Sequence, residues 1–192
     1  DFGTHGERIY LAMELIEGED LESLIQDSGP ISESMGWALA RQVAAGLAHA
    51  QELGIVHRDI KPANLLLTKP PAGFAMAENV PLVKITDFGL AKLAVEQGGK
   101  TRLTVVGTAM GTPFYMAPEQ VSDSDVDHRA DIYALGVSMF HMLTGMPPYQ
   151  GMTIGQIVVA KVTGDSSWLD DLTTHCSVES MRLLKLMVAS DP

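Results

Sequence analysis

Hydrophobic and polar positions follow two spacings along the chain, which predict a short β-rich start and a mainly helical remainder. Residues 8–15 are rich in apolar and β-favouring side chains and predict a strand. A polar turn at 17–20 leads into a short helix, which Pro30 ends. Ser32 is a candidate N-cap for a second helix, in which apolar residues recur at helical spacing before a stop at Gly54.

The rest of the chain also predicts strands followed by helices. Short apolar runs at 65–67 and 83–86 predict two strands, and an irregular connection that begins at Lys69 joins them. Residues 96–112 have little periodicity and predict a loop. Further helices are predicted at about 129–143, 154–163 and 178–189. The pattern indicates an α+β fold.

Composition narrows the class of protein. The 192 residues fit one domain, and 46% of them are apolar. A formal net charge of −11 argues against a nucleic-acid surface, which would need a basic patch. A single cysteine, Cys176, cannot form an internal disulfide, so we expect a reducing, cytoplasmic setting.

Two further points concern context. No apolar run approaches the length of a membrane span, so no membrane segment is expected within these residues, and an anchor outside them stays open. The chain starts without Met and ends at Pro192, which predicts a piece of a longer protein.

Three polar motifs carry the candidate chemistry. The segment 57–64, His-Arg-Asp-Ile-Lys-Pro-Ala-Asn, places a carboxylate, two cations and an amide within eight residues. Asp-Phe-Gly follows at 87–89, and Ala-Pro-Glu at 117–119. Phosphoryl transfer needs a carboxylate near the attacking hydroxyl, cations for the phosphate charge, and oxygen ligands for a hard metal ion. The ordered set therefore predicts phosphoryl-transfer machinery.

These motifs resemble those of a known family. Residues 54–64, Gly-Ile-Val-His-Arg-Asp-Ile-Lys-Pro-Ala-Asn, and 112–120, Thr-Pro-Phe-Tyr-Met-Ala-Pro-Glu-Gln, resemble eukaryotic-type (Hanks-type) serine/threonine protein kinases, most of all bacterial members. The resemblance covers essentially the whole chain. It implies a partial protein kinase domain over 1–192, with the last small-lobe strands and hinge at 1–19. The large lobe would then occupy 20–192 and stop before its final helix.

The resemblance assigns the catalytic roles. It implies ATP-dependent transfer of the γ-phosphate to serine or threonine hydroxyls of protein substrates. Asp59 would orient the hydroxyl and take its proton, and Lys61 would reach the transferred phosphate. Asn64 and Asp87 would hold Mg²⁺, with Mn²⁺ as the alternative ion. Thr112 would bridge the catalytic Asp and Lys.

Nucleotide contacts are implied in the same way. Met13 would lie at the back of the nucleotide pocket, and backbone groups of Glu14 and Ile16 would bond the adenine. Asp20 would meet the ribose, and Leu66 would form the apolar floor beneath the ring.

Regulation is implied by the stretch from 87 to 119, which resembles an activation segment. Arg58 is a cation that a phosphate on this loop would satisfy, with Lys92 as its helper. The family also allows self-phosphorylation in trans. The candidate acceptors, among which the sequence does not choose, are Thr101, Thr104 and Thr108.

Other residues are expected to support the site. Asp131 would be buried and accept hydrogen bonds from the backbone of His57 and Arg58. Phe88 and Gly89 complete the metal motif, and Glu119 would pair with an arginine that the family places beyond the last helix. The first Asp-Phe-Gly, at 1–3, precedes the catalytic loop, so we do not expect it to bind metal.

The chain also lacks expected parts. The glycine-rich loop, the strand lysine and its partner glutamate belong to the small lobe, so we expect residues 1–192 alone to have little or no activity. Two alternatives remain. A pseudokinase would serve as a scaffold without transfer, although the intact catalytic set speaks against it. A small-molecule phosphotransferase would not need Arg58 or the segment 112–119.

Acidic residues cluster beside the predicted hinge and again after Glu119. Both clusters could favour basic residues near the phosphate acceptor. The alternative, which the net charge of −11 favours, is that they are solvated surface. The clusters are Glu17, Glu19, Asp20 and Glu22, and Asp123, Asp125 and Asp127.

Overall fold

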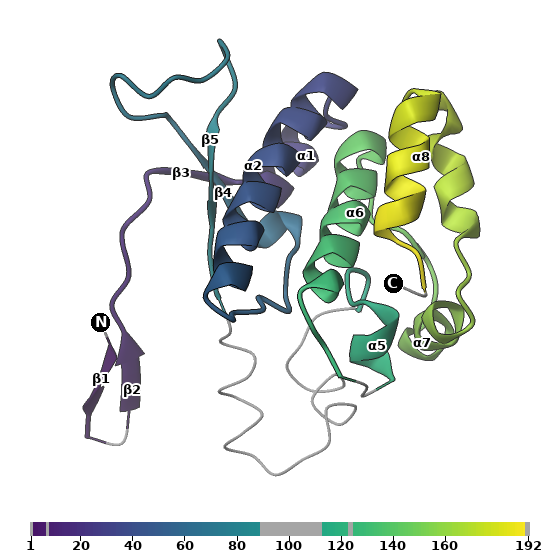
Figure 1. The fold of residues 1–192 in the computed structure, drawn as a ribbon, viewed down its shortest axis with the longest axis horizontal. Helices are drawn as coiled ribbons and strands as arrows, with labels where there is room; N and C mark the ends of the chain where they lie inside the picture. The colour runs from purple at the N-terminus through teal and green to yellow at the C-terminus, as the bar shows by residue number, and fades with distance from the viewer. Residues whose placement is uncertain (1, 7, 89–112, 123–124, 191–192) are drawn as a thin grey trace.

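A computed structural model describes residues 2–6, 8–88, 113–122 and 125–190. Within them, a helical body carries one small sheet along its side, and a separate two-stranded hairpin lies at the N-terminal end (Figure 1). The helix-rich body with a small sheet confirms the predicted α+β class.

The hairpin pairs β1 (Phe2–His5) with β2 (Arg8–Leu11) in antiparallel register, with Gly3 opposite Tyr10. Phe2 and Gly3 of the first Asp-Phe-Gly therefore lie within a strand. The strand predicted over 8–15 ends at Leu11, and residues 12–17 have no regular structure.

The three-stranded sheet has the order β3–β4–β5, all antiparallel, with β3 (Gly18–Asp20), β4 (Leu65–Thr68) and β5 (Leu82–Ile85). The expected polar turn at 17–20 is thus wrong, since residues 18–20 form a strand. The reason is long-range pairing with β4. Gly18 permits it, because a Cβ there would lie 2.0 Å from the Leu67 carbonyl oxygen.

Two helices precede the predicted catalytic loop. α1 (Leu21–Ser28) begins at Asp20, whose side chain accepts a hydrogen bond from the Ser23 amide. α2 (Glu33–Glu52) begins after Ser32, as the sequence predicts. The Ser32 hydroxyl makes no capping hydrogen bond, and lies 3.4 Å from the hydroxyl of Ser34.

The core is centred on α6 (Arg129–Thr144), which packs against α2 and against α8 (Val178–Met187). From residue 130 to 143, every residue of α6 except Ile132 is buried. A helix that is apolar nearly all round belongs in the middle of a helical layer. Gly145 ends α6 in the left-handed conformation, at φ 79°.

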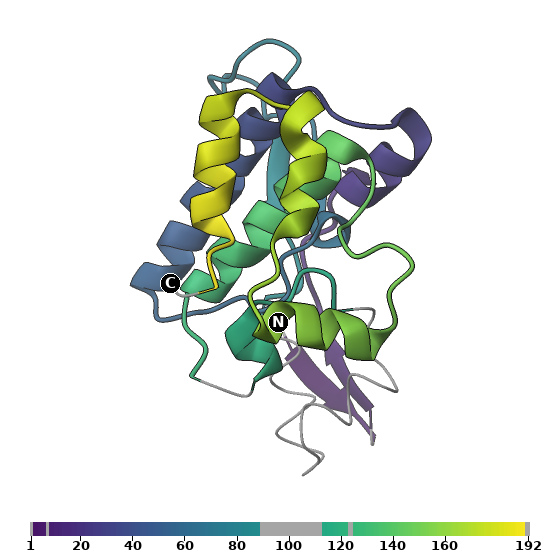
Figure 2. The same cartoon turned by 90° about the vertical axis from the view of Figure 1, so that its right-hand side faces the viewer.

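Three shorter helical elements complete the fold. α5 (Pro118–Val121) lies beside α7 (Ile154–Val162), and Figure 2 shows α7 crossing below α6 and α8. A 3₁₀ segment, η2 (Ser167–Thr174), packs on α6 and α8 and was not predicted. The predicted helices at 129–143, 154–163 and 178–189 are confirmed to within about two residues at each end.

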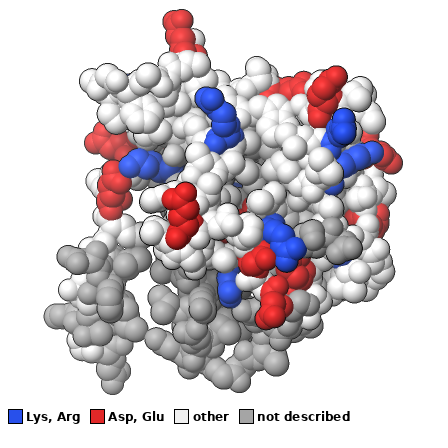
Figure 3. Space-filling view, viewed as in Figure 1, with Lys and Arg blue, Asp and Glu red and all other residues white. Residues whose placement is uncertain are grey.

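Charge is distributed rather than gathered on the face shown in Figure 3, where acidic side chains interleave with Lys and Arg. No helix within the described residues combines the length and the apolar character that crossing a membrane requires.

Candidate active site

The loop between α2 and β4 brings Asp59, Lys61 and Asn64 together. The Lys61 ammonium lies 2.8 Å from Asp59 Oδ2, and the Asn64 amide nitrogen donates to the same oxygen at 3.0 Å. Asn64 also donates to the Asp59 backbone carbonyl at 2.7 Å. A short 3₁₀ turn, η1 (Pro62–Asn64), makes this possible, because it folds the amide back over the carboxylate. The two oxygens of Asp59 therefore have a fixed direction.

His57 anchors the loop from inside. Its side chain is fully buried, its Nε2 lies 2.7 Å from the Thr86 carbonyl oxygen, and its Nδ1 accepts the Asp59 amide at 3.2 Å. Because Nδ1 accepts, Nε2 carries the proton and donates to Thr86. His57 thus links the segment before Asp59 to the residue that follows β5.

Asp131 holds the same loop from α6. It is 3% exposed, and its two carboxylate oxygens accept the amides of His57 and Arg58 at 2.8 and 2.7 Å. Burial raises the pKa of Asp131, while these two backbone hydrogen bonds oppose the rise. This is the position and contact set that the sequence predicts for Asp131.

Arg58 has a left-handed backbone, at φ 69°, which is uncommon outside glycine. Both of its peptide groups are held: the amide by Asp131, and the carbonyl by the Gln120 side-chain nitrogen at 2.9 Å. Gln120 also accepts the Ala117 amide at 2.9 Å. The strained residue is therefore fixed from two helices, α6 and α5. Sequence reasoning missed Gln120, although it directly follows Ala-Pro-Glu.

Asp87 and Phe88 follow β5. The Thr86 amide donates to the Asn64 carbonyl at 3.0 Å, which brings Asp87 next to the Asn64 segment. Asp87 is exposed and has φ 63°, and the Phe88 ring meets the His57 ring edge-on at 4.6 Å between centroids. Carboxylate and amide oxygens suit a hard divalent ion that keeps ligands from water and phosphate. The donor set thus fits Mg²⁺, although no group of three or more His, Cys, Asp or Glu gathers within the described residues.

The predicted nucleotide residues are less tightly held. Met13 is 64% exposed, and the Glu14 carboxylate pairs with Lys84 at 3.1 Å on the surface. Asp20 and Leu66 lie opposite each other across β3 and β4, so the structure brings these two together. The Asp20 carboxylate caps α1 through Ser23. Ile16 is partly buried.

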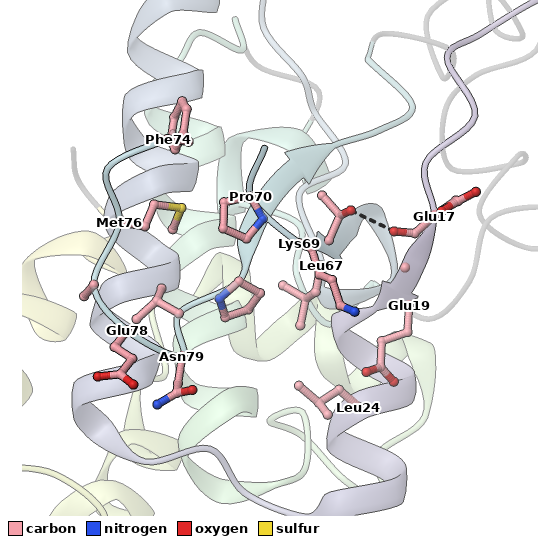
Figure 4. A pocket seen from close by; sticks show the side chains of 15 residues that line it. Glu17, Glu19, Leu24, Leu67, Lys69, Pro70, Phe74, Met76, Glu78 and Asn79 are labelled. Atoms are coloured by element: carbon pink, nitrogen blue, oxygen red, sulfur yellow. Dashed lines mark hydrogen bonds between the residues drawn. The ribbon is translucent and has the colours of Figure 1, made fainter. Parts of the chain in front are cut away.

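A groove of about 1050 Å³ lies beside β4 (Figure 4). Leu67 lines it, whereas Leu66 does not. Successive residues of a strand face opposite sides, so the groove is distinct from the predicted nucleotide floor. The long connection after β4, including Phe74 and Met76, forms one wall, and Glu19 and Leu24 lie on the other.

The end of the predicted activation segment packs against the helical body. The Tyr115 hydroxyl lies 2.8 Å from Nδ1 of His141, whose pKa burial lowers to about 4. Glu119, in α5, is partly exposed and lines a cavity of about 280 Å³ with Arg129 and Ser190. The remaining predicted residues lie outside the described part of the chain: Gly89, Lys92, Thr101, Thr104, Thr108 and Thr112.

Comparison with known proteins agrees with this geometry. The family model "Protein kinase domain" matches residues 1–192. The chain is 37% identical over 164 residues to the serine/threonine-protein kinase PknH of Mycobacterium tuberculosis, which covers 85% of this chain and 24% of PknH. Identity to PknD of the same organism is 36%, covering 83% of this chain and 22% of PknD.

A third relative, the serine/threonine-protein kinase PknE of Mycobacterium tuberculosis, is 37% identical over 79% of this chain and 24% of its own length. The chain thus spans about a quarter of the length of the curated relatives it matches. Family match and geometry lead to one conclusion: the chain belongs to the protein kinase family, and resembles its bacterial serine/threonine members.

Proposed function

We propose that this chain is the catalytic part of an enzyme that transfers the γ-phosphate of ATP to serine or threonine hydroxyls of proteins. The observation that carries the proposal is the arrangement around Asp59. Its carboxylate is partly exposed and is oriented by Lys61 at 2.8 Å and by Asn64 at 3.0 Å. A fixed carboxylate beside a cation suits a hydroxyl that must give up its proton while its oxygen attacks a phosphorus centre.

The proposed reaction follows from these groups. The acceptor hydroxyl gives its proton to Asp59 as its oxygen bonds the γ-phosphorus, and the bond to the ADP oxygen breaks. Lys61 neutralises charge on the transferred group. Asn64 and Asp87 would hold Mg²⁺, which neutralises phosphate charge when bound, and Mn²⁺ is the alternative ion. Thr112 would bridge Asp59 and Lys61 once substrate is bound.

The proposal extends to the parts of the domain. Residues 1–19 would be the last small-lobe strands and hinge, and residues 20–192 the large lobe. Met13, Glu14, Ile16, Asp20 and Leu66 would contact the nucleotide. Arg58 and Lys92 would receive a phosphate on the activation segment, placed there in trans by a second copy. The candidate acceptors for it are Thr101, Thr104 and Thr108.

Asp59→Asn in the full-length kinase tests the assignment. The amide cannot take the proton, so kcat for a serine- or threonine-containing protein should fall by about 10²–10⁴-fold. Radiolabelled γ-phosphate transfer measures this, with the exposed Asp27→Asn as the matched control. Undiminished transfer by Asp59→Asn would refute the role of Asp59. A wild-type enzyme that binds ATP and transfers nothing would instead indicate a scaffold.

The isolated segment 1–192 provides a second test. We expect its transfer rate to lie below that of the full-length enzyme by a factor on the order of 10³ or more, because the lysine–glutamate pair that orders the phosphates is not among its residues. Equal rates for the two proteins would contradict this.

A further inference from the structure

Lys161 is the most deeply buried charged side chain that the proposed reaction leaves without a role. It lies in α7, whose other buried residues are Ile157 and Ala160, and only 1% of its surface is exposed. Lysine is seldom buried to this degree unless its charge has partners. Packing alone therefore does not explain why a lysine is buried at this position.

The partners of Lys161 are a carbonyl, a hydroxyl and two aromatic faces. Its Nζ donates to the Phe114 carbonyl at 2.9 Å and to the Tyr133 hydroxyl at 3.4 Å. The same nitrogen lies 4.9 Å from the ring centre of Tyr133 and 5.1 Å from that of Tyr149. Ring faces attract a cation electrostatically, so the two tyrosines help to hold the ammonium where it donates to the Phe114 carbonyl.

Phe114 belongs to the stretch 113–117, which lies between the catalytic loop and α7. One end of this stretch is tied to the loop through Gln120, which bonds both the Ala117 amide and the Arg58 carbonyl. Its middle is tied to α6 through Tyr115 and His141. The Lys161 bond is the tie from α7. The stretch also directly follows Thr112, which the proposed reaction puts beside Asp59.

We propose that Lys161 is a positioning residue that sets the affinity for the protein substrate by fixing the Phe114 carbonyl. The inference rests on the proposed function, since it takes the stretch 113–117 to be the surface that meets the chain carrying the acceptor. Without the ammonium, the Phe114 carbonyl loses its hydrogen bond to α7. The Phe114 peptide then samples orientations that do not fit the protein substrate. ATP binding and the proton transfer at Asp59 do not pass through this bond.

Stability and substrate affinity should respond differently to this residue. Burial lowers the pKa of Lys161 to about 7, because the interior solvates the ammonium less well than water does. Replacing Lys161 by methionine removes the desolvation cost of a buried charge, which offsets the loss of its hydrogen bond to the Phe114 carbonyl. A residue that served the fold alone would therefore show no loss of substrate affinity when so replaced.

The test compares Lys161→Met with the wild type in the full-length kinase, with the exposed Lys185→Met as matched control. Losing a charged hydrogen bond should raise KM for a serine-containing peptide by about tenfold. We expect kcat, KM for ATP and the melting temperature to stay within error of the wild type. A peptide KM within twofold of the wild type would overturn the proposal. So would an equal rise in both KM values together with a lower melting temperature.

Two further measurements keep the test decisive. If Lys161→Met does not fold, Lys161→Gln retains a donor without charge and should raise the peptide KM by about threefold, and an unchanged value would overturn the proposal. If the wild type transfers no phosphate, the proposed function fails. Amide hydrogen exchange at 114–117 then decides the role of Lys161: faster exchange in Lys161→Met supports it, and equal exchange overturns it.

Discussion

The catalytic loop, 57–64, and the predicted nucleotide stretch, 12–17, are held to the protein in different ways. In the loop, His57 is fully buried. Four of the hydrogen bonds that fix the loop come from residues far along the chain, directly after β5, on α5 and on α6. In the stretch, Met13 and Leu15 are 64% and 89% exposed. Its contacts with the sheet include a surface ion pair between Glu14 and Lys84 and a hydrogen bond from the Thr68 hydroxyl to the Glu17 carbonyl.

The difference shows where the geometry of each half of the site comes from. Asp131 and Gln120 of the helical body hold the backbone at His57 and Arg58. Lys61 and Asn64, within the loop itself, then orient the Asp59 carboxylate. Exposed apolar side chains such as Met13 and Leu15 instead indicate a surface that packs against something further. We infer that the helical body positions the proposed proton acceptor, Asp59, whereas the proposed nucleotide side is completed by other contacts.

Asp131→Ala should have the largest effect on the catalytic loop. It leaves the amides of His57 and Arg58 without their acceptors, so we expect a loss of about 2–4 kcal/mol in the free energy of unfolding. Displacing the loop should lower kcat by about 10²-fold. Urea denaturation and transfer assays measure the two effects. Asp127→Ala, at an exposed ion pair with Arg129, is the control and should change stability by less than about 1 kcal/mol.

Gln120→Ala should have an intermediate effect that is specific to activity. It removes the bond to the Arg58 carbonyl, and we expect kcat to fall by about tenfold, with a loss of stability of about 1–2 kcal/mol. Gln42→Ala is a close control, because the Gln42 side chain also bonds backbone groups, among them the Pro81 carbonyl and the Val83 amide beside the sheet. Equal kcat losses in both variants would contradict a specific link between α5 and the loop.

Glu14→Ala should have the smallest effect. The ion pair of Glu14 with Lys84 is exposed, with 69% and 40% of the two side chains accessible, so its removal should cost less than about 0.5 kcal/mol. Because the proposed adenine contact of residue 14 is made by its backbone, KM for ATP should change by less than about twofold. A large rise in this KM would show that the Glu14 carboxylate itself binds the nucleotide.

The long helices and the catalytic motifs could be predicted from the sequence because their signals are local. The apolar spacing of α2 and the left-handed Gly145 after α6 both act within a few residues. The strand at 18–20 could not be predicted, since it depends on pairing with residues 66–68. The 3₁₀ segment η2 was missed although its buried residues, Trp168, Leu169 and Leu172, stand at helical spacing, because the segment is only eight residues long.

In the candidate site, too, local contacts could be predicted from the sequence and long-range contacts could not. Asp59, Lys61 and Asn64 lie close in sequence and meet in the structure. The ties to Gln120 and Lys161 cross 62 and 47 residues, respectively, and need the fold. One signal was present for Lys161: it is the single charge in the apolar run Ile157-Val-Val-Ala-Lys-Val162.

Amide hydrogen exchange of the full-length kinase, with and without Mg²⁺ and ATP, tests the central claim most directly. The account predicts that the amides of His57 and Arg58 exchange slowly in both states, because Asp131 holds them without help from the nucleotide. Amides 14–16 should exchange rapidly and become protected only with nucleotide. Catalytic-loop amides that gain protection only when ATP binds would contradict it.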